Sequence, residues 1–308
     1  MTEASIPPRV RPGDAVAVIA PASPVPGDRL RAGLERAGTR WRLRVPDDIE
    51  RAHGFLAGDD ARRADEVNRA LRDPDVRALW LARGGYGILR LLPLLDADAL
   101  RRDPKPIIGF SDATALLAWA ELEAGVRGVH GPVLVQLGKL PPADAAWLFD
   151  LVEGRAGAAA VLATGLRRVG APAVGAVEGR LVGGNLCLLA HLCGTRYQVP
   201  VEGAIVLVEE VDEKPYAIDR DLTHMALAGG WRGAAGALVG DFTACEDPKY
   251  PTATWADVVD ERLRAFGVPA LAGAPVGHGA VNRAFSFGGR VALDPEAGSA
   301  VLLDPAVG

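Results

Sequence analysis

The chain has 308 residues, of which 49% are hydrophobic and 24% are charged, and its formal net charge is −5. This length exceeds the usual size of one domain and predicts two domains with an ample apolar core. The acidic balance argues against nucleic acid or an anionic membrane surface as the partner.

The N-terminal residues have neither the basic nor the apolar region of a signal peptide, and the longest apolar run, around residues 16–22, has the length of a core strand. The three cysteines, Cys187, Cys193 and Cys245, lack any C-x-x-C spacing. We expect buried thiols in a reducing compartment, not a zinc site or a disulfide framework. The protein is therefore expected to be cytoplasmic, with no metal and no cofactor.

Strand and helix patterns alternate through the first half. Strands are predicted at residues 15–20, 41–45, 78–82 and 106–110, and helices at 28–37, after the N-cap Asp59, at 88–95 and at 113–124. This alternation implies right-handed crossovers and a parallel sheet.

A stretch rich in glycine, alanine and arginine, residues 156–171, interrupts this rhythm and is the predicted linker. Beyond it we expect strands at 179–182, 204–209 and 237–240, and helices at 185–193, 219–227 and 254–266. The predicted fold is α/β: a parallel-sheet N-terminal domain over residues 1–155, and a smaller, β-containing α+β C-terminal domain over 172–308.

A serine lies at a predicted strand-to-helix turn, in the run Gly109-Phe110-Ser111-Asp112-Ala113. Small residues two before and two after the serine are typical of a nucleophile elbow, here in the form G-x-S-x-A. The alternative is a serine or aspartate that merely caps the following helix.

A second glycine-rich turn, Gly84-Gly85-Tyr86-Gly87, follows the preceding strand. If the two strands are neighbours, the amides of Gly85 and Asp112 converge beside the Ser111 hydroxyl as an oxyanion hole. The alternatives are a plain tight turn or a phosphate-binding loop, but the lysine and Ser/Thr of a phosphate loop do not follow these glycines. A dinucleotide fingerprint is also a poor match.

A catalytic serine needs a base, and the chain has five histidines. His278 is the best candidate, because its flanking glycines let the backbone bend sharply and bring the imidazole to a cleft. His130 could line the site or hydrogen-bond to a turn. Of the other three, His53 lies in a charged loop, and His191 and His224 lie in predicted helices.

The base in turn needs a carboxylate to fix its tautomer. Glu209 and Glu210 end an apolar strand, and strand alternation places them on opposite faces, so only one can serve the site. The alternative is that both lie at a solvated strand end.

These motifs resemble the LD-carboxypeptidases, a family of serine peptidases of the murein tetrapeptide carboxypeptidase and microcin C immunity peptidase types. The resemblance extends over nearly the whole chain and is carried by residues 17–23, 82–87, 108–114, 130–132, 179–186, 209–216, 219–220 and 277–279.

The resemblance implies Ser111 as nucleophile, His278 as general base and Glu209 as orienting carboxylate, with the amides of Gly85 and Asp112 as oxyanion donors. It also implies a site between the two domains and a homodimer. Two departures are the pair Glu209-Glu210, where the family often has Glu-Asp, and the stretch 285–288, where it often has proline before glycine.

The predicted reaction is metal-free release of a C-terminal D-amino acid from an L-centre, as in murein tetrapeptide during cell-wall recycling. Arg83, and with it Tyr86, is assigned to substrate binding, because a guanidinium can hold a terminal carboxylate through two hydrogen bonds; the alternative is that Arg83 braces Asp112 or another carboxylate. Two other functions stay open: a microcin C-type peptidyl-nucleotide amide hydrolase, with Trp231 or Trp255 stacked on the base, and a non-catalytic small-molecule binder.

Overall fold

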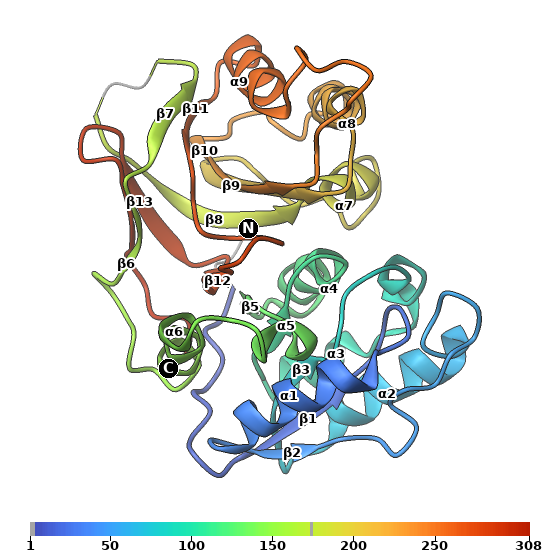
Figure 1. The fold of residues 1–308 in the computed structure, drawn as a ribbon. Helices are drawn as coiled ribbons and strands as arrows, with labels where there is room; N and C mark the ends of the chain where they lie inside the picture. The colour runs from blue at the N-terminus through green and yellow to red at the C-terminus, as the bar shows by residue number, and fades with distance from the viewer. Residues whose placement is uncertain (1–3, 173–174) are drawn as a thin grey trace. The chain divides into compact units, whose positions relative to one another are not determined.

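The computed structural model describes residues 4–172 and 175–308 (Figure 1). The chain forms two compact units. The first holds the residues up to Ala156 together with Ala284–Ser286 and Pro305–Gly308, and the second holds Gly157–Arg283 and Phe287–Asp304.

A six-stranded sheet forms the centre of the first unit, in the order β12-β5-β4-β3-β1-β2. The strands β5, β4, β3, β1 and β2 run parallel to one another. Their bounds are β1 Ala15–Ile19, β2 Arg42–Arg44, β3 Val76–Leu81, β4 Ile107–Gly109, β5 Gly128–His130 and β12 Phe285–Phe287. β1 and β3 lie inside the sheet and are almost completely buried, as their continuous apolar runs predict.

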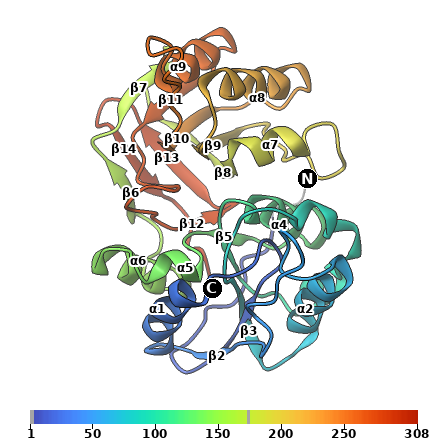
Figure 2. The ribbon, with the colours of Figure 1, turned by 45° about the vertical axis from the view of Figure 1, so that its right-hand side comes forward.

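Helices flank this sheet, and Figure 2 shows α1 and α5 on one side and α2 on the other. The helices are α1 Gly27–Gly38, α2 Asp60–Arg72, α3 Ala97–Arg102, α4 Ala113–Trp119, α5 Leu134–Leu137 and α6 Pro142–Val152. The predicted N-cap is confirmed, since the Asp59 carboxylate accepts the Arg62 N–H at 2.8 Å. Helices on both sides of a parallel sheet are typical of an α/β fold, so the α/β prediction is confirmed for this half of the chain.

Two predicted helices of the first unit are wrong in detail. Residues 88–95 form two 3₁₀ turns, Ile88–Arg90 and Leu92–Leu94, because Pro93 has no N–H to continue an α-helix. The helix predicted over 113–124 is α-helical only to Trp119 and continues as a π-helical turn, Ala120–Ala124. The elements α3, β5, β12, α5 and α6 were not predicted from the sequence.

The second unit has an eight-stranded mixed sheet, in the order β6-β14-β13-β8-β9-β10-β11-β7. The central strands β8 to β11 are parallel, and antiparallel strands extend the sheet at both ends. Their bounds are β6 Val161–Thr164, β7 Arg167–Gly170, β8 Val177–Asn185, β9 Ala204–Val211, β10 Gly236–Thr243, β11 Pro269–Ala272, β13 Arg290–Asp294 and β14 Ser299–Leu302.

Three helices accompany the parallel strands of this sheet, and Figure 2 shows them stacked beside one another. They are α7 Leu186–Leu192, α8 Pro215–Leu227 and α9 Trp255–Ala265, within a residue or two of prediction except for the start of α8, which is four residues earlier. Pro215 at the first position of α8 explains that earlier start, because proline suits the first turn of a helix.

The segment predicted as a linker, residues 156–171, contains the edge strands β6 and β7, which pair with β14 and β11. An edge strand pairs with a neighbour on one side only, and charged side chains are common there. A stretch rich in glycine and arginine can therefore form edge strands. The domain boundaries themselves stay a prediction.

Candidate active site

Ser111 lies at a sharp turn between β4 and α4, as the elbow pattern predicts. Its φ is +63°, in the left-handed region, which for a residue other than glycine costs about 1–2 kcal/mol. A Cβ at Gly109 would lie 2.9 Å from the Ala113 Cβ, so the small residues on either side of the serine are required by close packing. The residue at the N-cap of α4 is Asp112, and its side chain makes no capping hydrogen bond.

The glycine-rich turn lies directly beside this serine within the first unit. β3 and β4 are neighbours, as the oxyanion-hole hypothesis requires. A Cβ at Gly84 would stand 3.0 Å from the Ser111 Cβ and 3.1 Å from its Oγ, so only a glycine leaves room for the hydroxyl. Gly85, next in the chain, is exposed and has a φ of +113°, a conformation that glycine adopts without strain.

The Asp112 side chain connects the two turns. Its Oδ2 accepts the Ile88 N–H at 2.9 Å, although the carboxyl is almost completely buried. Burial raises the pKa of Asp112 to about 6, and the hydrogen bond from Ile88 offsets only part of that effect.

In the second unit, His278 and Glu209 form a hydrogen-bonded pair. His278 Nδ1 lies 2.7 Å from Glu209 Oε2, and the glutamate is fully buried at the carboxyl-terminal part of β9. A carboxylate at that distance fixes the proton on Nδ1 and leaves Nε2 as the basic nitrogen. Burial tends to lower the pKa of His278, but the hydrogen bond and charge of Glu209 outweigh it, so the pKa is raised above 6.5.

The glycines beside His278 allow the imidazole to come close to the Glu209 carboxylate. Gly277 has a φ of +131°, and a Cβ there would lie 2.9 Å from Glu209 Oε2. A Cβ at Gly279 would overlap the Asp241 carboxylate. The sharp backbone bend expected at this motif is therefore present, and Asp241 on β10 is a third acidic group near the imidazole.

The neighbouring glutamate serves a different partner. Glu210 Oε1 accepts the Asn185 Nδ2–H at 2.7 Å and Oε2 accepts the Cys187 N–H at 2.8 Å. Burial raises the pKa of Glu210 to about 7. Both glutamates are buried, so the alternative of a solvated strand end is wrong.

The two predicted substrate-binding residues differ in their contacts. Arg83 Nη1 donates to the Pro24 carbonyl at 2.7 Å, a backbone group rather than the carboxylate that the alternative expected. The Tyr86 ring is half exposed and meets the Phe55 ring edge-on, with 5.6 Å between centroids.

The other candidates lie in structural surroundings. His130 is buried with its ring stacked on Phe285 at 4.7 Å. His191 Nδ1 is 2.7 Å from the Cys187 carbonyl oxygen on the same helix. Trp231 is buried against Phe266, and Trp255 is stacked on Phe242 at 4.6 Å.

The cysteines are free thiols, but only Cys245 is fully buried; Cys187 and Cys193 are partly exposed, which corrects the expectation for those two. Burial raises the pKa of Cys187 to about 12 and that of Cys245 to about 11, so both are poor nucleophiles. Over residues 4–172 and 175–308, no group of three histidine, cysteine, aspartate or glutamate residues could hold a metal ion. Within those same residues, no helix has the length and apolar character to cross a bilayer.

Sequence reasoning missed Asp241, Ser23 and Arg63. Asp241 follows Gly240 near the carboxyl end of a parallel strand, and a search for polar residues at such ends could have found it. Ser23 Oγ accepts the Tyr86 N–H and Arg63 Nη1 donates to the Gly87 carbonyl, both far along the chain, and nothing in the local sequence pattern signals these bonds.

Family models match both halves of the chain. A model of the LD-carboxypeptidase N-terminal domain matches residues 16–131, and one of the C-terminal domain matches residues 178–293. This chain belongs to the LD-carboxypeptidase family. The predicted family and its peptidase activity are thereby confirmed.

A curated relative, the murein tetrapeptide carboxypeptidase of Pseudomonas aeruginosa, is 34% identical over 290 residues, covering 91% of this chain and 92% of that protein. The structure of muramoyltetrapeptide carboxypeptidase from Oxalobacter formigenes is similar with a TM-score of 0.78 and 25% identity, covering 94% of this chain and 97% of the other. The microcin C7 self immunity protein MccF, solved with aspartyl sulfamoyl adenosine, has a TM-score of 0.88 at 21% identity, covering 99% and 100%, and shares the fold. The two-part α/β architecture of this chain is thus shared with both solved structures.

Proposed function

We propose that this LD-carboxypeptidase acts on murein tetrapeptide, with Ser111 as nucleophile, His278 as general base and Glu209 as the carboxylate that orients it. The observation that carries the proposal is the 2.7 Å hydrogen bond between His278 Nδ1 and buried Glu209. It leaves His278 Nε2 ready to take a proton, as a serine nucleophile requires. The substrate is favoured by the murein tetrapeptide carboxypeptidase of P. aeruginosa, which matches 91% of the chain.

In the first step, Ser111 Oγ attacks the carbonyl carbon of the L,D-peptide bond while His278 Nε2 takes the hydroxyl proton. The amides of Gly85 and Asp112 stabilise the oxyanion that forms, and one such donor is worth roughly 2.7–4 kcal/mol of barrier. The C–N bond then breaks, and His278 returns its proton to the leaving amine of the D-amino acid. Water, deprotonated by His278, hydrolyses the acyl-serine ester and regenerates the hydroxyl.

Arg83 and Tyr86 are proposed to bind the substrate beside this centre. Arg83 uses one nitrogen for the Pro24 carbonyl, and a guanidinium has five N–H donors, so donors remain for a terminal carboxylate. Tyr86 follows the oxyanion donor Gly85 directly in the chain, and its half-exposed ring is open to a substrate.

The test is mass-spectrometric detection of D-alanine released from a muropeptide, combined with fluorophosphonate labelling. Ser111 is expected to be labelled in the wild-type protein, and Ser111→Ala is expected to lose both the label and D-alanine release. Labelling that persists in Ser111→Ala would overturn the nucleophile. A wild-type protein that binds muropeptide but releases nothing would favour the non-catalytic binder.

The second candidate keeps the chemistry and changes the substrate to a peptidyl-nucleotide amide. It is favoured by the similarity to MccF, solved with aspartyl sulfamoyl adenosine, although at 21% identity that similarity concerns the fold. The two tryptophans considered for a nucleobase stack already pack on Phe266 and Phe242. Cleavage of an aminoacyl-sulfamoyl adenylate without any cleavage of tetrapeptide would refute the first candidate.

We further propose that the protein is a cytoplasmic homodimer. It is expected to use neither cofactor nor metal and to bind no nucleic acid or membrane. Light scattering of the purified protein tests the dimer, and activity that survives dialysis against a chelator tests the metal-free mechanism.

A further inference from the structure

The glycine-rich turn beside Ser111 is held by side chains at three consecutive residues. The Tyr86 N–H, the Gly87 carbonyl and the Ile88 N–H are each bonded to a side chain from a different part of the first unit. The three side chains are Ser23, Arg63 and Asp112.

Arg63 is completely buried on α2. Its Nη1 donates to the Pro21 carbonyl at 2.5 Å and to the Gly87 carbonyl at 3.1 Å, and its Nε donates to the Gly58 carbonyl at 3.2 Å. It also forms an ion pair with Asp60. Burying a guanidinium is costly unless its donors are satisfied, so this residue ties three loops into one rigid arrangement.

Ser23 lies directly over Gly85. Its Oγ accepts the Tyr86 N–H at 3.1 Å, and its own N–H donates to the Gly84 carbonyl at 3.4 Å. A Cβ at Gly85 would overlap the Ser23 hydroxyl. The peptide groups on both sides of Gly85 are therefore fixed by one serine.

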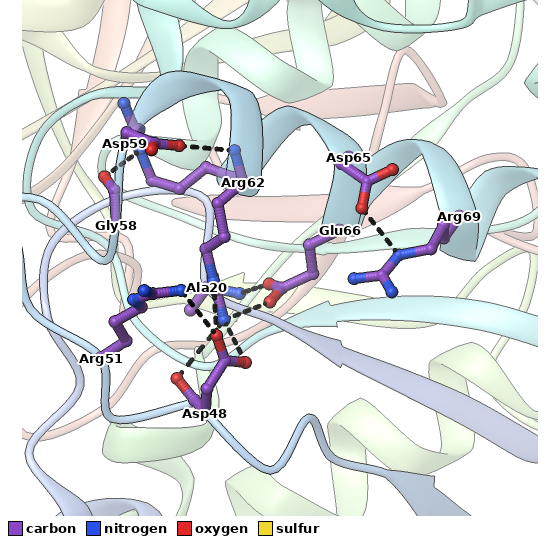
Figure 3. Close-up of polar contacts among 10 residues, drawn as sticks. Ala20, Asp48, Arg51, Gly58, Asp59, Arg62, Asp65, Glu66 and Arg69 are labelled. Atoms are coloured by element: carbon purple, nitrogen blue, oxygen red, sulfur yellow. Dashed lines mark hydrogen bonds and ion pairs between the residues drawn. The ribbon is translucent and has the colours of Figure 1, made fainter.

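The segment that carries Ser23 is itself anchored to α2. Glu66 Oε1 accepts the Ala20 N–H at 2.5 Å, and Glu66 pairs with Arg62, which also pairs with Asp48 (Figure 3). Figure 3 shows the Glu66 carboxylate directed at the Ala20 nitrogen, with the Arg62 side chain reaching down between Glu66 and Asp48. The chain directly after β1 is thus held by two side chains of α2, with Glu66 at the Ala20 N–H and Arg63 at the Pro21 carbonyl.

Asp112 couples the serine turn to the glycine turn. Its backbone amide is one proposed oxyanion donor, and its carboxylate holds Ile88, three residues after the other donor. The two donors cannot move independently while this bond is intact. Preorganised donors stabilise the transition state without reorganisation, and a misplacement of about 1 Å can cost roughly 10²-fold in rate.

We propose that Ser23, Arg63 and the Asp112 carboxylate are positioning residues, which hold the Gly85 amide in the direction that an oxyanion requires. The inference rests on the proposed serine mechanism. It adds a function for the 20–23 segment and for α2, neither of which carries a proposed catalytic group.

The experiment measures kcat and KM for tetrapeptide hydrolysis, the rate of fluorophosphonate labelling at Ser111, and the midpoint of thermal unfolding. The variants are Ser23→Ala, Arg63→Lys, Asp112→Ala and Asp112→Asn. Because the oxyanion exists only in the transition state, we expect kcat to fall about tenfold or more with little change in KM, and labelling to slow by a similar factor. Asp112→Asn keeps an oxygen that can accept the Ile88 N–H, so it is expected to recover most of the activity lost in Asp112→Ala.

Matched controls separate positioning from general stability. Ser5→Ala removes a surface hydroxyl that donates to the Gly125 carbonyl, and Arg36→Lys alters a guanidinium that holds the Leu137 and Leu140 carbonyls. Both controls are expected to change stability without changing kcat. Arg63→Lys is compared with Arg36→Lys, and Ser23→Ala keeps the test decisive if Arg63→Lys does not fold.

Wild-type activity with unchanged kcat in Ser23→Ala and Asp112→Ala would overturn the positioning proposal and leave the serine mechanism intact. A rise in KM at constant kcat would also overturn it, because the loss would then be in substrate binding. A wild-type protein that is neither labelled nor active would instead overturn the mechanism and the positioning proposal together.

Discussion

The two units contribute to the proposed chemistry by different physical means. In the first unit the proposed site depends on backbone geometry: the positive φ that presents the Ser111 hydroxyl, two glycines, and the amides of Gly85 and Asp112. In the second unit it is made of side chains, a buried carboxylate hydrogen-bonded to an imidazole at 2.7 Å. We therefore expect activity to be sensitive to substitutions that alter backbone geometry in the first unit, and to substitutions that alter charge in the second unit.

The largest effect is expected at the strained serine. Ser111→Ala and Ser111→Gly should each lower kcat by up to about 10⁶-fold, as loss of a triad serine does. Only Ser111→Gly relieves the positive φ, so its free energy of unfolding should rise by about 1 kcal/mol. Calorimetry checks this, and a Ser111→Gly variant that is less stable than Ser111→Ala would show that the backbone at Ser111 carries no strain, because only the entropy cost of glycine would then remain.

The adjacent glutamates provide a matched test of the side-chain site. Glu209→Gln should lower kcat by about 10⁴-fold, because the amide no longer fixes the His278 tautomer. Glu210→Gln should leave kcat within about tenfold of wild type, since Glu210 affects His278 only through its charge. The measurement is the steady-state kcat of the two purified variants. A larger loss of kcat in Glu210→Gln than in Glu209→Gln would assign Glu210 as the carboxylate of the triad.

The pH dependence of kcat/KM should show the raised pKa of His278. The base must be neutral to act, so activity should fall as the pH drops through a value above 6.5. Asp241→Asn removes one of the negative charges that raise the pKa of His278, so it should move this acid limb to lower pH. A limb unchanged in Asp241→Asn would show that Asp241 does not affect the imidazole.

The effect furthest from catalysis is expected on the pH dependence of stability. Asp112 and Glu210 have pKa values raised by burial to about 6 and about 7, so each binds a proton more tightly in the folded state than in the unfolded chain. Their contribution to the free energy of unfolding should fall as the pH rises from about 4 to about 7, by up to about 2–3 kcal/mol each. Urea unfolding at pH 4.5 and pH 8 should show a smaller difference for Asp112→Asn and Glu210→Gln than for wild type.

Sequence patterns predicted correctly the features that depend on interactions between residues close together in the chain. The Asp59 cap, the buried strands β1 and β3 and the turn at Ser111 each depend on neighbouring residues, and all three are as predicted. The replacement of one predicted helix by 3₁₀ turns was also open to a sequence argument, since Pro93 stands in its middle.

By itself, the sequence determined the alternation that separates Glu209 from Glu210, and the glycines that let the backbone bend at His278. Which glutamate meets the imidazole was decided by tertiary structure, because the two partners are 69 residues apart. The same holds for Arg63, whose hydrogen bonds reach Pro21 and Gly87, 42 and 24 residues away. Periodicity and caps are set by contacts within a few residues, whereas these bonds exist only after the sheet brings distant loops to one edge.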